Sequence, residues 1–297
     1  MRVIDLPASL DFQTSEALIT EVSGSGSGKV LFDGRRLRWV GPNGMVSLLA
    51  AGAVVLDRSG EVPRLALPPE GDVRNYLDRM EFFEAAAKIF EPDVTTGKRV
   101  AGESEVLLEV TSIMTNSDVH EVVDRVQKRA GAILSKTLSY PPTSVVQFSV
   151  ILSEVCQNII EHADAPGWVT AHSYNWSKRL GRQVVVISLA DLGRGFRGSL
   201  AEEHSAHFAD RWGDATALEA AFIHGLTRFP DSGRGQGIQQ IRKQVRRWDG
   251  LISIRSGTAR ISDVPNWSDE PPMEEGLSDF PGAQINIILP ERVGHEV

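Results

Sequence analysis

With 297 residues, of which 41% are hydrophobic, the chain is long enough to bury a sizeable core and is expected to form two domains. Its formal net charge of −8 argues against a surface built to bind nucleic acid. One cysteine, no signal-peptide pattern at the beginning and a longest apolar run of only residues 45–56 indicate a cytoplasmic protein that does not cross a membrane.

Residues 1–90 alternate between strand and helix patterns, which predicts a small α/β domain. The expected strands cover residues 3–6, 30–32 and 64–67, and the expected helices cover residues 12–22, 45–56 and 73–86. The glycine-rich stretch 23–29 superficially resembles a phosphate loop. However, Val30 stands where a serine or threonine would hold Mg²⁺, and a strand follows where a helix is needed. We interpret the stretch as a flexible turn.

This order of elements, with its strand-turn-helix at residues 37–49, resembles the STAS domain of anti-sigma-factor antagonists. In that family the turn usually presents a phosphorylatable serine at the helix start, where the helix dipole stabilises the added charge. Here the turn reads Gly41-Pro42-Asn43-Gly44, and Ser47 lies about one turn deeper as a surface or packing residue. The resemblance therefore implies a docking surface without the phosphoswitch. Residues 91–104, rich in polar residues and without apolar periodicity, are expected to form a linker.

The remainder of the chain, residues 105–297, predicts a second α/β domain. We expect strands at 106–113, 168–176, 182–189, 251–261 and 282–289, and helices at 118–138, 143–162, 199–212, 214–226 and 238–248. The helix over 143–162 carries Glu154, Asn158 and His162. A step of four residues overshoots a full turn by roughly 40°, so these side chains follow one narrow stripe. Taken alone, the stripe also fits an ordinary solvated helix face.

Two glycine-bearing segments accompany this helix. Asp191-Leu192-Gly193-Arg194-Gly195 follows a predicted strand, where a carboxylate can accept a hydrogen bond from an exocyclic amine and glycines let backbone approach a flat ring. Gly233-Arg234-Gly235-Gln236-Gly237 opens a predicted helix, whose free N–H groups and positive dipole end favour phosphates. Each pattern is weak by itself, because aspartate and glycine are common in turns.

Together the three motifs, ExxxNxxxH on a helix, DxGxG after a strand and GxGxG before a helix, resemble those of the GHKL (Bergerat-fold) ATPase superfamily. The resemblance covers about residues 105–290 and points most closely to the anti-sigma serine kinases. It implies a two-layer α/β sandwich, with a mixed sheet and helices on one face, preceded by the smaller STAS-like α/β domain. The implied organisation is a STAS-like domain at 1–90, a linker at 91–104 and an ATP-binding domain at 105–297.

The resemblance also implies roles for individual residues, with ATP and Mg²⁺ as cofactors. Asn158 would hold Mg²⁺ as a neutral oxygen ligand, and Glu154 would be the catalytic base that orients water or a substrate hydroxyl. Asp191 would bind the adenine amino group, while His162 would brace the site. The glycines would bring backbone close to the nucleotide, with Arg234 the better candidate than Arg228 to reach the γ-phosphate; these glycines are Gly193, Gly195, Gly233, Gly235 and Gly237.

The expected function is a nucleotide-dependent switch that binds Mg-ATP, hydrolyses it slowly and acts on protein partners in a bacterial-type regulatory or signalling system. Two alternatives stay open. One is a serine/threonine protein kinase of the anti-sigma type that phosphorylates a partner. The other is a nucleotide-binding scaffold without turnover. The family analogy adds a homodimer.

Several other residues have simpler interpretations. His204 and His207 share a helix face but lack further metal ligands, so a solvated helix is favoured over a metal site. Cys156, in an apolar helical context, is expected to fill the core. The acidic stretch 263–279 is interpreted as a solvated loop, with partner docking as the alternative. The predicted helix after the glycine loop has a basic face, which in an acidic chain favours a protein contact or a solvated face over DNA binding. This face comprises Arg242, Lys243, Arg246 and Arg247.

Overall fold

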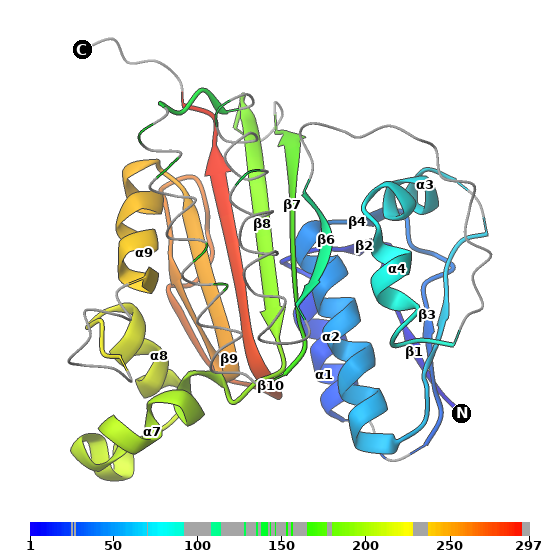
Figure 1. The fold of residues 1–297 in the computed structure, drawn as a ribbon, viewed down its shortest axis with the longest axis horizontal. Coiled ribbons are helices and arrows are strands. Elements are labelled where there is room, and N and C mark those ends of the chain that lie inside the picture. The colour runs from blue at the N-terminus through cyan, green and yellow to red at the C-terminus, as the bar shows by residue number, and fades with distance from the viewer. Residues whose placement is uncertain are drawn as a thin grey trace.

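The computed structural model shows an α/β protein with two main sheets (Figure 1). It describes residues 1–24, 26, 28–69, 71–91, 108–113, 128, 135, 138–141, 143, 146, 153, 156, 165–176, 180–227 and 237–292. We call residues 1–91 the N-terminal module and residues 108–292 the C-terminal module. Among the described residues, no helix is long and apolar enough to span a membrane.

The N-terminal module confirms the predicted alternation of strands and helices. Its three-stranded parallel sheet has β3 (Val30–Asp33) in the centre, flanked by β1 (Arg2–Asp5) and β5 (Arg64–Ala66). A two-stranded parallel ladder joins β2 (Ser9–Leu10) to β4 (Trp39–Val40). The helices are α1 (Ser15–Ser23), α2 (Pro42–Ser59), α3 (Asp72–Arg79) and α4 (Phe82–Ala86).

Two boundary predictions in this module are wrong. The single helix expected over residues 73–86 is two helices, because Glu81 takes a left-handed conformation with φ of 54° and interrupts the helical hydrogen bonding. Glu91, expected to begin the linker, belongs to the module. Its carboxylate lies 2.6 Å from Lys29 Nζ and 3.2 Å from Arg64 Nε, and its backbone bridges to Arg64. The rest of the expected linker lies outside the described residues.

The C-terminal module is built on a five-stranded sheet in the order β6-β7-β8-β10-β9. Its strands are β6 (Leu108–Ile113), β7 (Gly167–Asn175), β8 (Gln183–Asp191), β9 (Leu251–Asp263) and β10 (Met273–Pro290). Every strand pair that the described residues form in this sheet is antiparallel, so the expected mixed sheet is wrong for this part of the chain. The described helices of the module are α7 (Gly195–Phe208), the short 3₁₀ helix η2 (Ala209–Arg211), α8 (Asp214–Phe222) and α9 (Gly237–Arg247).

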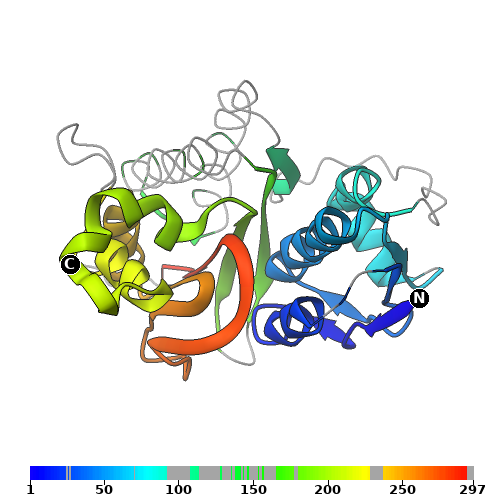
Figure 2. The ribbon, with the colours of Figure 1, turned by 90° about the horizontal axis from the view of Figure 1, so that it is seen from below.

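Alternate residues along the strands separate the two faces of this sheet. Val185, Ile187 and Leu189 of β8 pack with apolar residues of α8 and α9, so the described C-terminal helices contact one face, as expected. Ala190 of β8 and Trp168 of β7 point the other way and share a hydrophobic cluster with the N-terminal module. Figure 2 shows the sheet between these two layers.

Helix α2 forms the centre of the contact between the modules. It is buried around most of its circumference, from Pro42 to Val55, which is the pattern of a core helix and not of a surface helix. Ser47 is fully buried and its Oγ donates to Asn43 Oδ1 at 3.4 Å, so it is a packing residue. The helix lies beside β7 and β8 (Figure 1). The surface expected to dock a partner is therefore occupied, at least in part, by this chain's own sheet.

An ion-pair network joins α1 to β9 and β10 of the same sheet. Arg255 of β9 donates from Nε and Nη2 to the two carboxylate oxygens of Glu16, at 2.9 and 3.0 Å. Arg260 Nη2 donates to Glu16 Oε2 at 2.9 Å, and Arg260 Nη1 donates to Glu274 at 2.8 Å. Since the Arg255 side chain is only 4% exposed, this network is a largely desolvated link between the modules.

Candidate functional site at the end of strand β8

Asp191 is the last residue of β8 and lies at the point where the antiparallel sheet gives way to the glycine turn. Neighbouring residues of a strand point to opposite faces of the sheet, and Ala190 points to the N-terminal module. Asp191 therefore points to the face that carries the C-terminal helices, called the helical face below. The residue is 3% exposed, and its Oδ1 accepts a hydrogen bond from the backbone N–H of Gly193 at 2.8 Å. Burial raises the pKa of Asp191 to about 7, while backbone N–H groups of Gly193 and Ala283 act in the opposite direction.

The position of Asp191 confirms its prediction as a strand-end carboxylate. Within the described part of the chain, it is absent from the ion pairs that link partly buried carboxylates to arginines. A buried carboxyl without a countercharge is unusual unless a ligand or a proton compensates it. Asp191 is therefore suited to accept a hydrogen bond from a neutral N–H donor.

Glycines allow the chain to turn sharply beside Asp191. Gly195 has a φ of +63°, and a side chain there would meet Ser256 Oγ at 2.5 Å and the Gly282 carbonyl at 3.0 Å. Gly282, with φ of +74°, lies directly against the Asp191 backbone carbonyl. Ser256 Oγ accepts from Phe196 N at 3.0 Å and donates to Gly282 O at 2.9 Å.

From the sequence, the glycine at position 195 was expected to let a ligand ring lie close to it. In the structure the close neighbours of Gly195 are instead other parts of the chain. The site depends on Gly282 and Ser256, neither of which was identified from the sequence. The only available signal was Gly282 after Pro281 within a strand pattern, which is typical of a bulge or a close backbone approach. The pairing of β9 and β10 does shift register between Phe280 and Ala283.

The other expected nucleotide-binding residues are only partly described. Gly237 is buried and is the first described residue of α9, the helix that was expected after the GxGxG pattern. The stripe of Glu154, Asn158 and His162 lies outside the described residues, and so do Gly233, Arg234 and Gly235. Of the same predicted helix, four residues are described, and all four are helical: Ser153 and Cys156 are buried, and Thr143 and Val146 are exposed. Cys156 is fully buried in a hydrophobic core cluster, which confirms that it fills the core, and this burial raises the pKa of its thiol to about 12.

The structure favours the simpler interpretation of His204 and His207. The Nε2 atom of His204 lies 2.9 Å from the Thr227 carbonyl, which gives this ring a local partner. Among the described residues, no group of three or more His, Cys, Asp or Glu side chains could hold a metal ion.

The acidic stretch 263–279 is not the solvated loop that was expected. It reaches into both strands, since β9 ends at Asp263 and β10 begins at Met273. Asp263 pairs with Arg242 at 3.0 Å and with Arg246 at 2.6 Å. The acidic stretch and the basic face of α9 thus neutralise each other in part. Opposite charges far apart in sequence pair here because the β9–β10 hairpin passes beside α9.

Comparison with known proteins adds no relationship: no protein-family model matches this chain, and no curated protein shows significant similarity to it.

Proposed function

We propose that the C-terminal module binds ATP with Mg²⁺ on the helical face of the antiparallel sheet, in a GHKL-type site, and acts as a nucleotide-dependent switch. The observation that carries the proposal is Asp191: a buried carboxyl at a strand end, beside a glycine turn. In this proposal its carboxylate accepts a hydrogen bond from the adenine amino group. That group is a neutral donor, and bonding to it lowers the cost of ionising a buried carboxyl.

The remaining roles rest on the motif resemblance. Asn158 holds Mg²⁺, Glu154 orients the attacking water, and the glycine loop that ends at Gly237 surrounds the phosphates together with Arg234. The helix α9, described from Gly237 on, supports the last assignment, because a helix that follows a glycine loop offers the N–H groups of its N-terminus to phosphate.

The packing of the modules supports a switch. Asp191 and Ala190 are neighbours in β8, yet Ala190 belongs to the hydrophobic cluster shared with the N-terminal module. A nucleotide that displaces the end of β8 therefore acts on the contact between the modules. The proposal includes protein partners that recognise the state of this contact and a slow ATP hydrolysis that resets it. It also includes a homodimer.

The test compares thermal stabilisation by Mg-ATP in the wild type and in three variants, Asp191→Asn, Asn158→Ala and Glu154→Ala. A ligand at a hundred times its Kd adds about 2.7 kcal/mol to stability, which is easily measured as a rise in Tm. We expect the rise in the wild type and in Glu154→Ala, and its loss in the other two. Asp210→Asn, at an exposed aspartate, is the matched control.

If no adenine nucleotide raises the Tm of the wild type, the proposed function is wrong. If ATP binds, γ-labelled ATP separates the forms of the proposal. Release of free phosphate that depends on Glu154 supports the switch, and transfer of the label to a protein partner supports the kinase. If neither product forms although ATP binds, the result supports the scaffold.

A further inference from the structure

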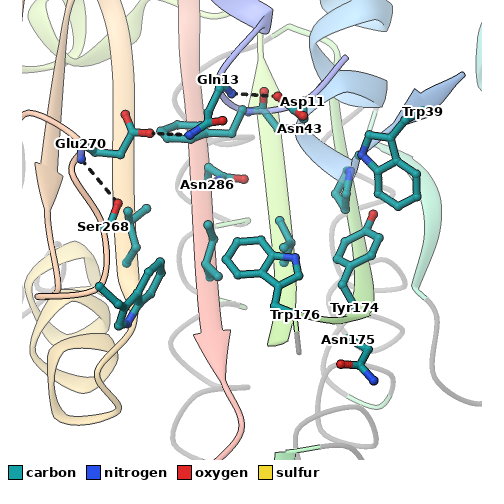
Figure 3. Close-up of a pocket in the computed structure, with 17 residues that line it drawn as sticks. Asp11, Gln13, Trp39, Asn43, Tyr174, Asn175, Trp176, Ser268, Glu270 and Asn286 are labelled. Carbon is teal, nitrogen blue, oxygen red and sulfur yellow. Dashed lines mark hydrogen bonds between the residues drawn. The ribbon is translucent and has the colours of Figure 1, made fainter. Parts of the chain in front are cut away.

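A second candidate site lies on the opposite face of the antiparallel sheet. Between this face and the N-terminal module there is a cavity of about 490 Å³ (Figure 3). The volume falls within the range of small-molecule sites. Both modules line it: the N-terminal residues include Trp39 and Asn43, and the C-terminal residues include Tyr174 and Asn286. Neither Asp191 nor its glycine turn is among the lining residues.

Asn286 of β10 lies in the middle of this cavity (Figure 3) and leaves a polar atom without a partner. The residue is 2% exposed. Its Oδ1 accepts from Ser188 Oγ at 2.7 Å, but Nδ2 has no hydrogen-bond partner in the described structure. Buried amide groups nearly always find partners, because leaving one unpaired is unfavourable. The free N–H₂ group therefore indicates a ligand that offers a hydrogen-bond acceptor.

Aromatic side chains supply flat walls around Asn286. Trp39 and Tyr174 approach each other with ring centroids 5.2 Å apart, and Trp176 and Trp267 do so at 6.2 Å. The aliphatic part of the lining comes from the sheet, namely Val186, Leu251 and Ile288. Tryptophan faces bind planar rings by stacking and attract positive charge. The walls therefore favour a planar ligand.

The charge of the cavity restricts the ligand further. Two carboxylates line it, Asp11 and Glu270, and no lysine or arginine is among the lining residues. Gln13 is shared between them: its backbone N–H donates to Asp11 Oδ1 at 3.1 Å and its Nε2 donates to Glu270 Oε1 at 3.5 Å. A phosphate would be repelled here, whereas an amino group can donate to the remaining carboxylate lone pairs.

We propose that this cavity binds a planar nitrogen heterocycle that carries an amino group and no phosphate, such as an aminopurine or aminopyrimidine. A ring nitrogen or carbonyl of the ligand accepts from Asn286 Nδ2, and its amino group faces Asp11 and Glu270. Its faces lie against the tryptophans. Because both modules line the cavity, such a ligand strengthens their packing.

Tryptophan fluorescence of the full chain tests the proposal, because three of the six tryptophans line the cavity. The probes are adenine and cytosine, with AMP and CMP as their phosphorylated counterparts. We expect saturable quenching by at least one free base, and binding of its phosphorylated counterpart weaker by about tenfold or more, since two carboxylates oppose the phosphate. Absence of saturable quenching by both bases overturns the proposal, and so does tighter binding of the nucleotides.

Variants assign the quenching to the cavity. Asn286→Leu should weaken binding by about twofold to tenfold, the range for one lost hydrogen bond. Gln284→Leu is the matched control, because Gln284 is also buried on β10 with an unpartnered Nε2 but does not line the cavity. If Asn286→Leu does not fold, Trp267→Leu replaces it, because Trp267 lines the cavity and is only half-buried.

The same titration in Asp191→Asn keeps this proposal separate from the nucleotide site. Unchanged quenching in that variant supports a second site, whether or not Mg-ATP binds elsewhere. Quenching that is lost in Asp191→Asn but kept in Asn286→Leu and Trp267→Leu assigns the ligand to the end of β8 and overturns the proposal.

Discussion

Asp191 holds its proton in the folded protein up to a pKa of about 7, whereas an unhindered aspartate releases it near 3.8. Between these values the folded state binds more protons than the unfolded chain, so the contribution of Asp191 to stability falls as the pH rises. Below about 3.8 this contribution is complete, and above about 7 it is lost.

We therefore expect the unfolding free energy to fall less in Asp191→Asn than in the wild type when the pH is raised from about 5 to about 8. The difference should be roughly 1.4 kcal/mol for each unit of the Asp191 pKa shift that lies within this window. Urea unfolding at both pH values measures it. His172, whose pKa burial lowers to about 4, gives the opposite slope but is present in both proteins and cancels in the difference. An identical pH dependence in the two proteins would contradict the raised pKa of Asp191.

The sequence predicted the location of Asp191 but not its surroundings. Because Asp191 follows a strand pattern in the sequence, it was expected at the end of a strand, and it is indeed the last residue of β8. Its burial depends on Gly282 and Ala283, which come from a strand far along the chain. Local periodicity carries no information about such long-range contacts, so the pKa of Asp191 could not be predicted from the sequence.

At the scale of elements, α1 and the β9–β10 hairpin depend on the carboxylate of Glu16. Glu16→Gln leaves Arg255 and Arg260, only 4% and 10% exposed, without that countercharge. We expect a loss of roughly 2–4 kcal/mol in unfolding free energy, slightly below the range for fully buried pairs because Glu16 itself is partly exposed. Denaturant unfolding measures the loss.

Glu21→Gln on the same helix is the matched control for Glu16. Its partner Arg2 and Glu21 itself are 38% and 57% exposed, so the change should cost less than about 1 kcal/mol. Equal losses in the two variants would show that the network contributes no more than a surface pair.

Most strands and helices with a clear period were predicted within a few residues, including β3, α2 and β7. Some of the errors come from contacts that lie outside the local pattern. The acidic stretch appeared solvated because its partner arginines, Arg242, Arg246 and Arg260, stand elsewhere in the sequence. The break at Glu81 has no signal in the apolar periodicity, which continues through it.

At the scale of the whole molecule, the two modules share one hydrophobic cluster, which the division into two domains did not anticipate. Val110, Trp168, Ala190 and Phe280 of the C-terminal module pack into the same cluster as α2. A shared core couples the unfolding of its parts. We therefore expect a single unfolding transition, with far-UV circular dichroism and tryptophan fluorescence giving the same midpoint.

A fragment of residues 105–297 provides the complementary measurement. Without the N-terminal module it exposes the apolar residues of the sheet face, so it should bind a hydrophobic dye and associate at concentrations where the full chain does not. Two separate transitions in the full chain, or a monomeric fragment that binds no dye, would mean that the modules fold independently.

Strand β8 imposes a constraint on how this chain can change during evolution. Its odd-numbered apolar residues pack against α8 and α9. Its even-numbered residues face the other way: Ala190 packs with the N-terminal module, and Val184 and Val186 form a separate cluster with Leu251 and Ile288. An insertion or deletion of a single residue within Gln183–Asp191 would exchange the two sets and damage both faces at once. Changes of length should therefore accumulate beyond the ends of the strand, while its interior can vary only by substitution.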